Sequence, residues 1–319
     1  MKRKAIAVAR GVLSHLPGLT MIGVEKTGGT NTARYCYSVW LRHLVKSREN
    51  GLEANPAAVA ELGPGDSLGI GLAALISGAE RYIALDISKY AHQRRNLDIF
   101  NELIALFEAR EPIPGDDEFP KVRPRLKDYG FPALILTSAR MEQALSPDRL
   151  NRIKEALESD DADNSMIRYS APWYGEKEIE ERSVDLLLSQ AVLEHVDNLH
   201  LAYAAMRKWL KPSGHMSHTI DFTSHGLADE WNGHWRYSNF LWRLIRGRRP
   251  WLINRQPFSL HADLLARNGM SIVSIERVEA ESKFRRSELA QACRGLREDD
   301  IVTRGVFLQA RIQSNCSLG

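Results

Sequence analysis

A glycine-rich turn between two carboxylates is the first place in this chain where residue types and spacing suggest chemistry. Glu61 ends a short apolar run, the turn Gly63-Pro64-Gly65 follows, and Asp86 ends the next apolar run. Glycines let the backbone approach a ligand closely, and the helix after such a turn presents free N–H groups at its start. A carboxylate in the position of Asp86 can accept hydrogen bonds from ribose hydroxyls. The pattern predicts a site for a nucleotide-type cofactor.

The charge around this turn narrows the cofactor class. A dinucleotide-binding turn would place a third glycine where this chain has Leu68. The carboxylates of Glu61 and Asp66 would repel a pyrophosphate, but they would attract a cationic cofactor that carries an amino acid tail. These observations favour S-adenosylmethionine over a nicotinamide dinucleotide.

Three side chains near the end of a later apolar run could take a proton from an acceptor. They are His218, Asp221 and His225, and imidazole and carboxylate groups are common general bases. On an ideal strand His218 and Asp221 point to opposite faces, so they share a pocket only if the strand ends near Ile220. We rank His225 and Asp221 together as the candidate base and place His218 behind them. The alternative role for each is a hydrogen-bonded residue at a strand end.

Short apolar runs alternate with helical patterns along most of the chain, which indicates βαβ units and a mostly parallel sheet. Ligands bind such sheets at the carboxyl ends of the parallel strands, where the residues above are expected to lie. The expected strands span residues 57–62, 82–85, 166–169, 184–188, 215–222, 271–278 and 302–312.

The chain divides into one domain with additions. We expect an N-terminal helical segment over residues 1–56, the main domain over 57–312 and a tail over 313–319. Residues 109–164 are rich in proline and charge and are too long for a simple loop, so we interpret them as an inserted lid or cap. Residues 223–256 form a second insertion, rich in aromatic and arginine side chains.

Four motifs in order make the chain resemble the class I S-adenosylmethionine-dependent methyltransferases. The motifs are Glu61-Leu62-Gly63-Pro64-Gly65, Ala84-Leu85-Asp86-Ile87, the run over 184–196 and the turn Leu210-Lys211-Pro212-Ser213-Gly214. The resemblance covers roughly residues 57–312, and it looks closest to bacterial methyltransferases of the polysaccharide or natural-product sugar type. It implies an α/β, Rossmann-like class I methyltransferase fold, with a mostly parallel seven-stranded sheet and helices on both faces. It also implies S-adenosyl-L-methionine as the cofactor.

Carried onto this sequence, the resemblance implies a set of cofactor contacts. Gly63 and Gly65 would pass under the methionine part of the cofactor. Asp86 would hold the ribose, and Ile87 would pack on the adenine. The remaining expected cofactor residues are Glu61, Pro64, Ser170, Ala171, Ser189 and Gln190.

The second insertion is the expected acceptor-binding surface, together with His195. Aromatic rings stack on sugar faces, and arginines hold phosphate or carboxylate groups. We expect Trp231, Trp235 and Arg236 to contact the acceptor. The predicted function is methyl transfer to a small polar acceptor, with a hydroxyl of a sugar, a lipid-linked sugar or a related metabolite favoured. The alternative is that a helix near 239–246 simply packs its aromatic side chains on the sheet edge.

The pair Glu194-His195 raises the question of a metal. In some quinone-ring methyltransferases of the same class, a Glu-x-x-Glu-His run binds a divalent ion. Here the first glutamate position is Ala191, and a Glu-His pair alone is a poor metal site. We therefore expect no metal, and we expect Glu194 and His195 to begin a helix and to shape the pocket.

Two other functions compete with this one. A methyltransferase acting on protein or nucleic acid often carries an Asn/Asp-Pro-Pro-aromatic run after the fourth strand, but here residues 189–192 read Ser-Gln-Ala-Val. A net charge of +3 also argues against a nucleic-acid partner. A non-catalytic Rossmann-like binding protein is the third possibility, and the intact Glu61 and Asp86 speak against it.

Composition suggests a reducing, cytoplasmic location. The three cysteines show no metal-binding or disulfide spacing, and there is no apolar run of about 18 residues. The basic start of the chain predicts an amphipathic helix, either an ordinary surface helix or a site of at most peripheral contact with anionic lipid. The oligomeric state stays open.

Overall fold

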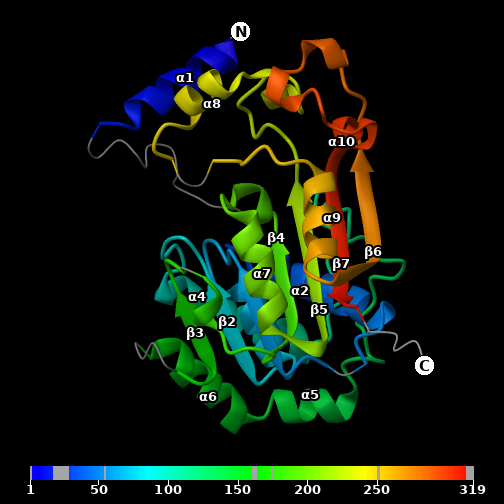
Figure 1. The fold of residues 1–319 in the computed structure, drawn as a ribbon. Coiled ribbons are helices and arrows are strands. Elements are labelled where there is room, and N and C mark those ends of the chain that lie inside the picture. The colour runs from blue at the N-terminus through cyan, green and yellow to red at the C-terminus, as the bar shows by residue number, and fades with distance from the viewer. Residues whose placement is uncertain are drawn as a thin grey trace, which may run out of the picture.

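A seven-stranded sheet forms the centre of the molecule. The computed structural model describes residues 2–16, 29–53, 55–159, 164–173, 175–249 and 252–313. The strands are β1 (Ala58–Leu62), β2 (Arg81–Leu85), β3 (Ile167–Ser170), β4 (Val184–Gln190), β5 (Leu210–Asp221), β6 (Met270–Glu279) and β7 (Thr303–Ile312). Their order is β3-β2-β1-β4-β5-β7-β6 (Figure 1). Strands β1 to β5 pair in parallel, and β7 runs antiparallel to β5 and β6.

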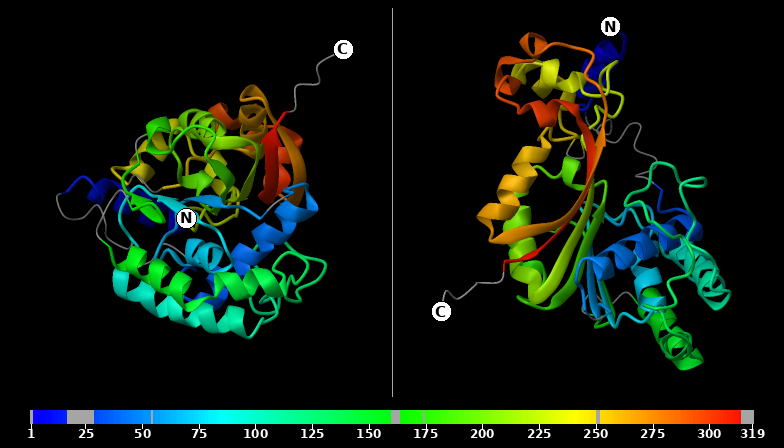
Figure 2. Two further views of the ribbon diagram at one scale, coloured as in Figure 1. Left: turned by 90° about the horizontal axis from the view of Figure 1, so that it is seen from below. Right: turned by 90° about the vertical axis from the view of Figure 1, so that its right-hand side faces the viewer.

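Helices cover both faces of this sheet (Figure 2), because successive strand residues point to opposite sides. Val59 and Leu186 enter one apolar core, while their neighbours Ala60 and Leu187 enter the other. The first core includes side chains of α2 (Ala33–Glu49), α3 (Gly69–Ile76) and α4 (Gln93–Glu108), and the second includes side chains of α7 (Leu199–Trp209) and α9 (Phe258–Arg267). The predicted α/β, Rossmann-like fold is confirmed.

The first insertion differs from the lid that we expected. It contains α5 (Ser138–Ala144) and α6 (Pro147–Glu158), and both lie at the end of the sheet opposite the tip of β5 (Figure 1). Arg140 donates to the carbonyl of Ser77 at 3.0 Å, and Arg149 donates to the carbonyl of Leu75 at 3.1 Å. These arginines donate hydrogen bonds to carbonyl groups at the end of α3, which have no partner within the helix. This part of the insertion therefore stabilises the side of the sheet where the strands begin.

The second insertion instead forms the centre of a cap above the carboxyl ends of the strands (Figure 1). We define the cap as residues 2–16, 223–249, 252–256 and 280–302. Its helices are α1 (Lys2–Leu13), α8 (Asn239–Arg246) and α10 (Glu298–Val302). Two small cores hold the cap together: one joins Ala7 to Trp242 and Ile245, and the other joins Trp235 to Phe284.

The N-terminal helical segment is therefore split between two places. Helix α2 packs on the sheet, whereas α1 belongs to the cap. Residues 17–28 and, in the predicted tail, residues 314–319 lie outside the described residues. No helix among the described residues is both long enough and apolar enough to cross a bilayer.

The segment after β4 also differs from expectation. Residues Leu193–His195 form a 3-10 turn, and α7 begins only at Leu199. The side chain of Asn198 accepts a hydrogen bond from the N–H of Leu201 at 3.0 Å, and this capping bond fixes the start of the helix. Further 3-10 turns span Glu176–Glu178, Gly233–Arg236, Arg286–Glu288 and Gln291–Cys293.

Candidate active site

The glycine turn after β1 has a backbone that requires glycine. Gly63 has φ +65° and Gly65 has φ +74°, in the left-handed region that glycine adopts without steric cost. The N–H of Gly63 donates to the carbonyl of Leu85 at 2.7 Å. A Cβ atom on Gly63 would lie 2.6 Å from Cγ2 of Val192. Both the dihedral angle and the lack of space exclude a side chain at this position.

Two side chains that our sequence reasoning missed hold the end of this turn. The N–H of Asp66 donates to Oγ1 of Thr30 at 3.0 Å, and the N–H of Leu68 donates to Oδ1 of Asn96 at 2.9 Å. Both donors would otherwise be free to bind an anion at the start of α3. Their use inside the protein agrees with a cofactor that has no phosphate here. Thr30 and Asn96 are too far from the turn in sequence to give a local signal.

Two buried carboxylates lie at the carboxyl ends of β1 and β2. Glu61 accepts a hydrogen bond from the Tyr82 hydroxyl at 2.5 Å; burial raises the Glu61 pKa to about 8, and the charge of Asp86 adds to this rise. Burial also raises the pKa of Asp86 to about 6, although the N–H of Ile87 donates to its Oδ1 at 2.7 Å. A cationic ligand between these carboxyl groups would relieve the cost of ionising them.

Strand register brings the other predicted cofactor residues to the same edge of the sheet. Leu62 at the end of β1 is level with Leu85 of β2 and Ser189 of β4. Ser170 at the end of β3 accepts a hydrogen bond from the N–H of Asp86 at 3.0 Å. The positions 170–171, at the end of β3, and 189–190, at the end of β4, therefore flank the turn from its two sides. Parallel pairing makes this arrangement necessary, because equivalent strand ends then meet at one edge.

A histidine–carboxylate pair lies at the carboxyl end of β5. Nε2 of His225 is 3.3 Å from Oδ2 of Asp221, and the N–H of Thr223 donates to Oδ1 of Asp221 at 2.8 Å. Burial alone would raise the Asp221 pKa, but the hydrogen bond and charge of His225 outweigh it, and the pKa lies below its usual value. Both side chains are partly exposed, so the imidazole can meet an acceptor while the carboxylate orients it.

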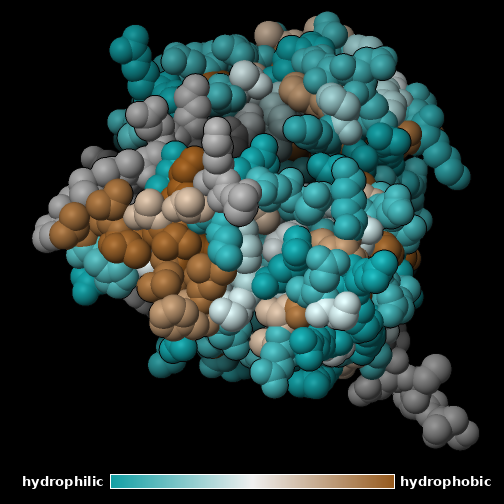
Figure 3. Space-filling view, turned by 90° about the horizontal axis from the view of Figure 1, so that it is seen from above, coloured by the Kyte–Doolittle hydropathy of each residue, from teal (hydrophilic) through white to brown (hydrophobic). Residues whose placement is uncertain are grey.

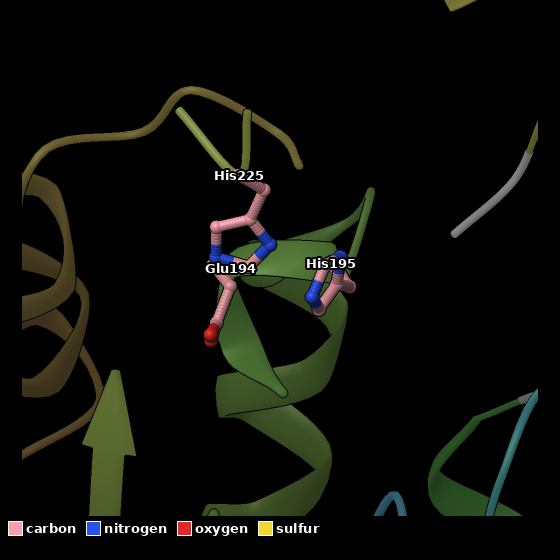
Figure 4. A group of neighbouring side chains, drawn as sticks. All are labelled: Glu194, His195 and His225. Atoms are coloured by element: carbon pink, nitrogen blue, oxygen red, sulfur yellow. The ribbon is translucent and has the colours of Figure 1, made fainter. Parts of the chain in front are cut away.

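A second histidine and a glutamate join this pair. The rings of His195 and His225 meet edge to face with centroids 5.1 Å apart (Figure 4). Glu194 is buried, and its Oε1 accepts from the N–H of Asp221 at 3.3 Å. Burial raises the Glu194 pKa well above its usual value. Burial therefore disfavours the charged form of this carboxyl group, and a bound cation would favour it.

Three of these side chains could hold a metal ion. Glu194, His195 and His225 each offer a ligand atom, and these atoms lie within 4.8 Å of one another (Figure 4). Imidazole nitrogens with one carboxylate suit a divalent transition metal. Glu194 would have to lose its proton on binding, because only the carboxylate is a good ligand. The expectation that no metal binds stays a prediction. The third possible ligand, His225, could not be found from sequence spacing, because it lies far from Glu194 and His195 in the chain.

His218 has a different environment from the other two candidate bases. Its side chain is 0% exposed, and its Nδ1 lies 2.8 Å from Oγ of Ser189. Burial lowers its pKa to about 3. His218 therefore has no exposed atom with which to contact an acceptor. Gln190 is half-buried, with its Oε1 3.1 Å from Nε2 of His43.

The predicted acceptor residues of the cap mostly make internal contacts. Trp235 is fully buried, and its Nε1 donates to the carbonyl of Arg255 at 3.0 Å. Trp231 is half-buried, and its Nε1 donates to the carbonyl of Glu281 at 3.1 Å. Arg236 is exposed and forms an ion pair with Glu288 at 3.0 Å. Trp235 thus packs inside the cap beside Phe284, and Trp242 of α8 packs in the core that contains Ala7 of α1 and not on the sheet edge that the alternative reading gave it.

His234 is a neighbour of the site that sequence reasoning passed over. It lies between the predicted Trp231 and Trp235, is buried, and stacks at a tilt on Trp235 with centroids 4.9 Å apart. Burial lowers its pKa to about 3, and the nearby charges of Arg255 and His225 lower it further. His234 is thus a buried, neutral imidazole whose nearest charged neighbours include His225 and Asp221. Its only sequence signal was a histidine within an aromatic run.

Comparison with known proteins gives a match to a family model and similarities to several solved structures. Residues 142–217 match the model of a methyltransferase domain family, and no match is found among curated proteins. A solved structure assigned as an S-adenosylmethionine-dependent methyltransferase from Listeria monocytogenes is 14% identical, with 86% of this chain and 99% of that chain covered and a TM-score of 0.41. A methyltransferase of the same description from Mesorhizobium loti is 13% identical, with coverage of 84% and 96% and a TM-score of 0.40. The carbon methyltransferase CurJ is 12% identical, with coverage of 81% and 49% and a TM-score of 0.35.

The sheet order and the family match indicate the same kind of fold. The order β3-β2-β1-β4-β5-β7-β6 with an antiparallel β7 is the seven-stranded arrangement that the resemblance implied. The matched residues run from α5 through β4 into β5 and so include the strand ends that meet the glycine turn. The chain has a seven-stranded, Rossmann-like fold, and its residues 142–217 match a methyltransferase domain family; both support S-adenosylmethionine as the cofactor.

Proposed function

We propose that this methyltransferase acts on an oxygen atom of a small polar acceptor, such as a hydroxyl of a sugar or a lipid-linked sugar. The observation that carries the proposal is the His225–Asp221 pair, with Nε2 3.3 Å from Oδ2 at the carboxyl end of β5. A hydroxyl has a high pKa and benefits from a general base, whereas a neutral amine already presents a lone pair. The pair therefore favours oxygen over nitrogen as the methyl acceptor.

The roles of the residues follow from ordinary substitution chemistry. The cofactor supplies an electrophilic methyl group on a sulfonium. In our proposal His225 removes the hydroxyl proton as the acceptor oxygen bonds to the methyl carbon, and the proton stays on the imidazole until solvent takes it. Asp221 orients the ring and stabilises the imidazolium, as carboxylates do beside catalytic histidines. His195, whose ring faces that of His225, would contact the acceptor from the other side.

The cofactor would occupy the edge formed by β1, β2, β3 and β4. Gly63 and Gly65 would let the backbone approach the methionine part, and Asp86 would accept hydrogen bonds from the ribose. Glu61 supports a cationic ligand, because its buried carboxyl group has an unusually high pKa that a nearby positive charge would lower. Pro64, Ile87, Ser170, Ala171, Ser189 and Gln190 complete the proposed site.

We also place the protein in a reducing compartment such as the cytoplasm. Cys36 and Cys293 are free thiols, and such thiols are typical of reducing environments. The balance of charges supports a small-molecule acceptor over a nucleic acid.

A methyl-transfer screen tests the proposed acceptor class. Purified protein and methyl-labelled S-adenosylmethionine are incubated with nucleotide sugars, lipid-linked saccharides, small phenols, amines and a protein extract. We expect label in the sugar or phenol samples, on an atom that acid-stable ether formation identifies as oxygen. Labelling confined to amines or to protein would contradict the oxygen-acceptor proposal. The catalytically impaired His225→Ala variant is the matched control for label that enters without enzymatic turnover.

A further inference from the structure

Within the cap, α1 packs against α8 through its smallest side chains. Ala7, Gly11 and Ser14 are buried, and a Cβ atom on Gly11 would come within 1.9 Å of the carbonyl oxygen of Leu244 in α8. The hydroxyl of Ser14 accepts from the N–H of Arg248 at 2.9 Å. This close approach of two helices fixes which face of α1 points inward.

The large apolar side chains of α1 consequently point outward. Ile6, Val12 and Leu13 of α1 and Leu16 of the turn that follows it are 53%, 51%, 46% and 51% exposed, and we call these four residues the outer face. Their spacing along the helix places them on one side, opposite the small residues. A surface helix of a globular protein normally has the reverse arrangement, with the apolar stripe turned to the core. Figure 3 shows hydrophobic side chains gathered in one area of the cap surface rather than scattered.

The charged side chains of α1 itself are all positive, and Asp229 is an acidic neighbour of Arg3. Arg3, Lys4 and Arg10 are exposed on α1, and the helix contains no acidic residue. Arg243 and Arg248 add exposed positive charge from the adjoining α8 segment. An apolar stripe with a basic border matches the interface of an anionic bilayer, where acyl chains lie beneath negative headgroups. A second copy of this chain would instead bring like charges together.

We propose that the outer face of α1 docks on the surface of an anionic phospholipid bilayer. Ile6, Val12, Leu13 and Leu16 enter the headgroup–acyl boundary, while Arg3, Lys4 and Arg10 contact the phosphates. Because α1 is packed on α8, docking places the cap against the membrane. The inference rests on α1 and stands whether or not the methyl acceptor is lipid-linked.

Vesicle co-sedimentation tests this docking directly. The full chain is mixed with vesicles of phosphatidylcholine alone or of phosphatidylcholine with phosphatidylglycerol, at low and at high salt. We expect binding to the anionic vesicles that weakens at high salt. The double variant Ile6→Asp, Leu13→Asp should bind at least tenfold more weakly, because it removes two apolar side chains and adds two negative charges.

Leu134→Asp is the matched control, since Leu134 is 97% exposed and lies in the first insertion, away from α1. We expect it to bind vesicles like the unchanged protein. All three proteins should melt at similar temperatures, because the substituted side chains are exposed. Binding by the unchanged protein that the double variant retains would overturn the proposal, as would failure of the unchanged protein to bind.

Sedimentation velocity without lipid tests whether a second copy of the chain, and not a bilayer, covers the outer face. We expect one species of the same size for the unchanged protein and the double variant. A dimer that the double variant converts to a monomer would overturn lipid docking and assign the outer face to self-association. Methyl transfer to a soluble acceptor should be unaffected by the double variant, so failure of docking and failure of the proposed function give different results.

Discussion

The proposed cofactor side and the proposed acceptor side of the sheet edge are built by different means. On the cofactor side, Gly63 and Asp86 take their places from a turn and a strand end that are local in sequence. On the acceptor side, His195 follows β4, Asp221 ends β5, and His225 lies in the first residues of the cap. The first arrangement depends on backbone geometry and the second on tertiary packing. Substitutions should therefore separate cofactor binding from turnover.

The largest expected effect is on turnover, from His225→Ala. If His225 is the base, the rate of methyl transfer should fall by about 10² to 10⁴, while the affinity for S-adenosylmethionine changes little. Single-turnover kinetics and calorimetry measure the two quantities. His200→Ala is the control, because His200 is an exposed histidine on α7. Full turnover in the His225 variant would remove it from the site and weaken the contrast between the two sides.

Gly63→Ala should damage the cofactor side most. The added Cβ meets Val192 at 2.6 Å in a backbone conformation with φ +65°, and clash and strain together cost roughly 2–5 kcal/mol of folding free energy. We expect a lower melting temperature and loss of measurable cofactor binding. Gly226→Ala provides the control, since Gly226 has φ +77° but open space around it. Equal effects in the two variants would mean that strain alone, without the clash, explains the loss.

Asp86→Asn should weaken cofactor binding without unfolding the protein. Loss of charged hydrogen bonds to the ribose costs about 1–3 kcal/mol, which calorimetry with S-adenosylmethionine measures. NADH should not bind to either protein. Asp98→Asn is the matched control, because Asp98 is an exposed carboxylate on α4. Unchanged affinity in the Asp86 variant would contradict its proposed role.

Cofactor affinity should depend on pH through Glu61. The pKa of Glu61 is about 8 in the free protein, so the group is protonated at pH 7, and a cationic cofactor favours its ionised form. Binding then releases a proton below pH 8. The affinity should rise with pH, by up to tenfold per unit, and level off above about pH 8. Asp86, with a pKa of about 6, steepens the dependence only at lower pH.

Glu61→Gln is the variant that isolates this effect. It should remove the rise between pH 7 and 8 while leaving the part due to Asp86. Calorimetry in buffers of different ionisation enthalpy counts the released protons. A pH-independent affinity in the unchanged protein would show that Glu61 does not face the positive charge of the cofactor.

The smallest expected effect is that of chelation. With His225 acting as a base, treatment with a strong chelator should leave turnover unchanged. A loss that a divalent transition metal restores would instead assign Glu194, His195 and His225 to an ion, consistent with ligand atoms within 4.8 Å of one another. The His195→Ala variant should then no longer regain turnover when the metal is added. This result would show that the metal acts at this site and not on a contaminant of the chelator-treated sample.

Much of the fold could be predicted from the chain because its signals are local. Apolar runs gave all seven strands to within a few residues at most boundaries, since a buried parallel strand needs a continuous apolar run. The position of α5 and α6 could not be predicted in this way. Their location depends on Arg140 and Arg149 reaching the carbonyls at the end of α3, and a hydrogen bond between distant segments leaves no periodic pattern.

The sequence by itself predicted the fold class, the kind of cofactor and the glycine turn, because neighbouring residues fix turns and strand ends. Only the tertiary structure decided which acceptor-side residues meet. It buried His218 and Trp235, paired Asp221 with His225 and brought His195 beside them. It also turned the apolar face of α1 outward, because Gly11 lets α1 pack on α8 through its small residues. Periodicity defines the faces of a helix, but the packing partner decides which face is buried.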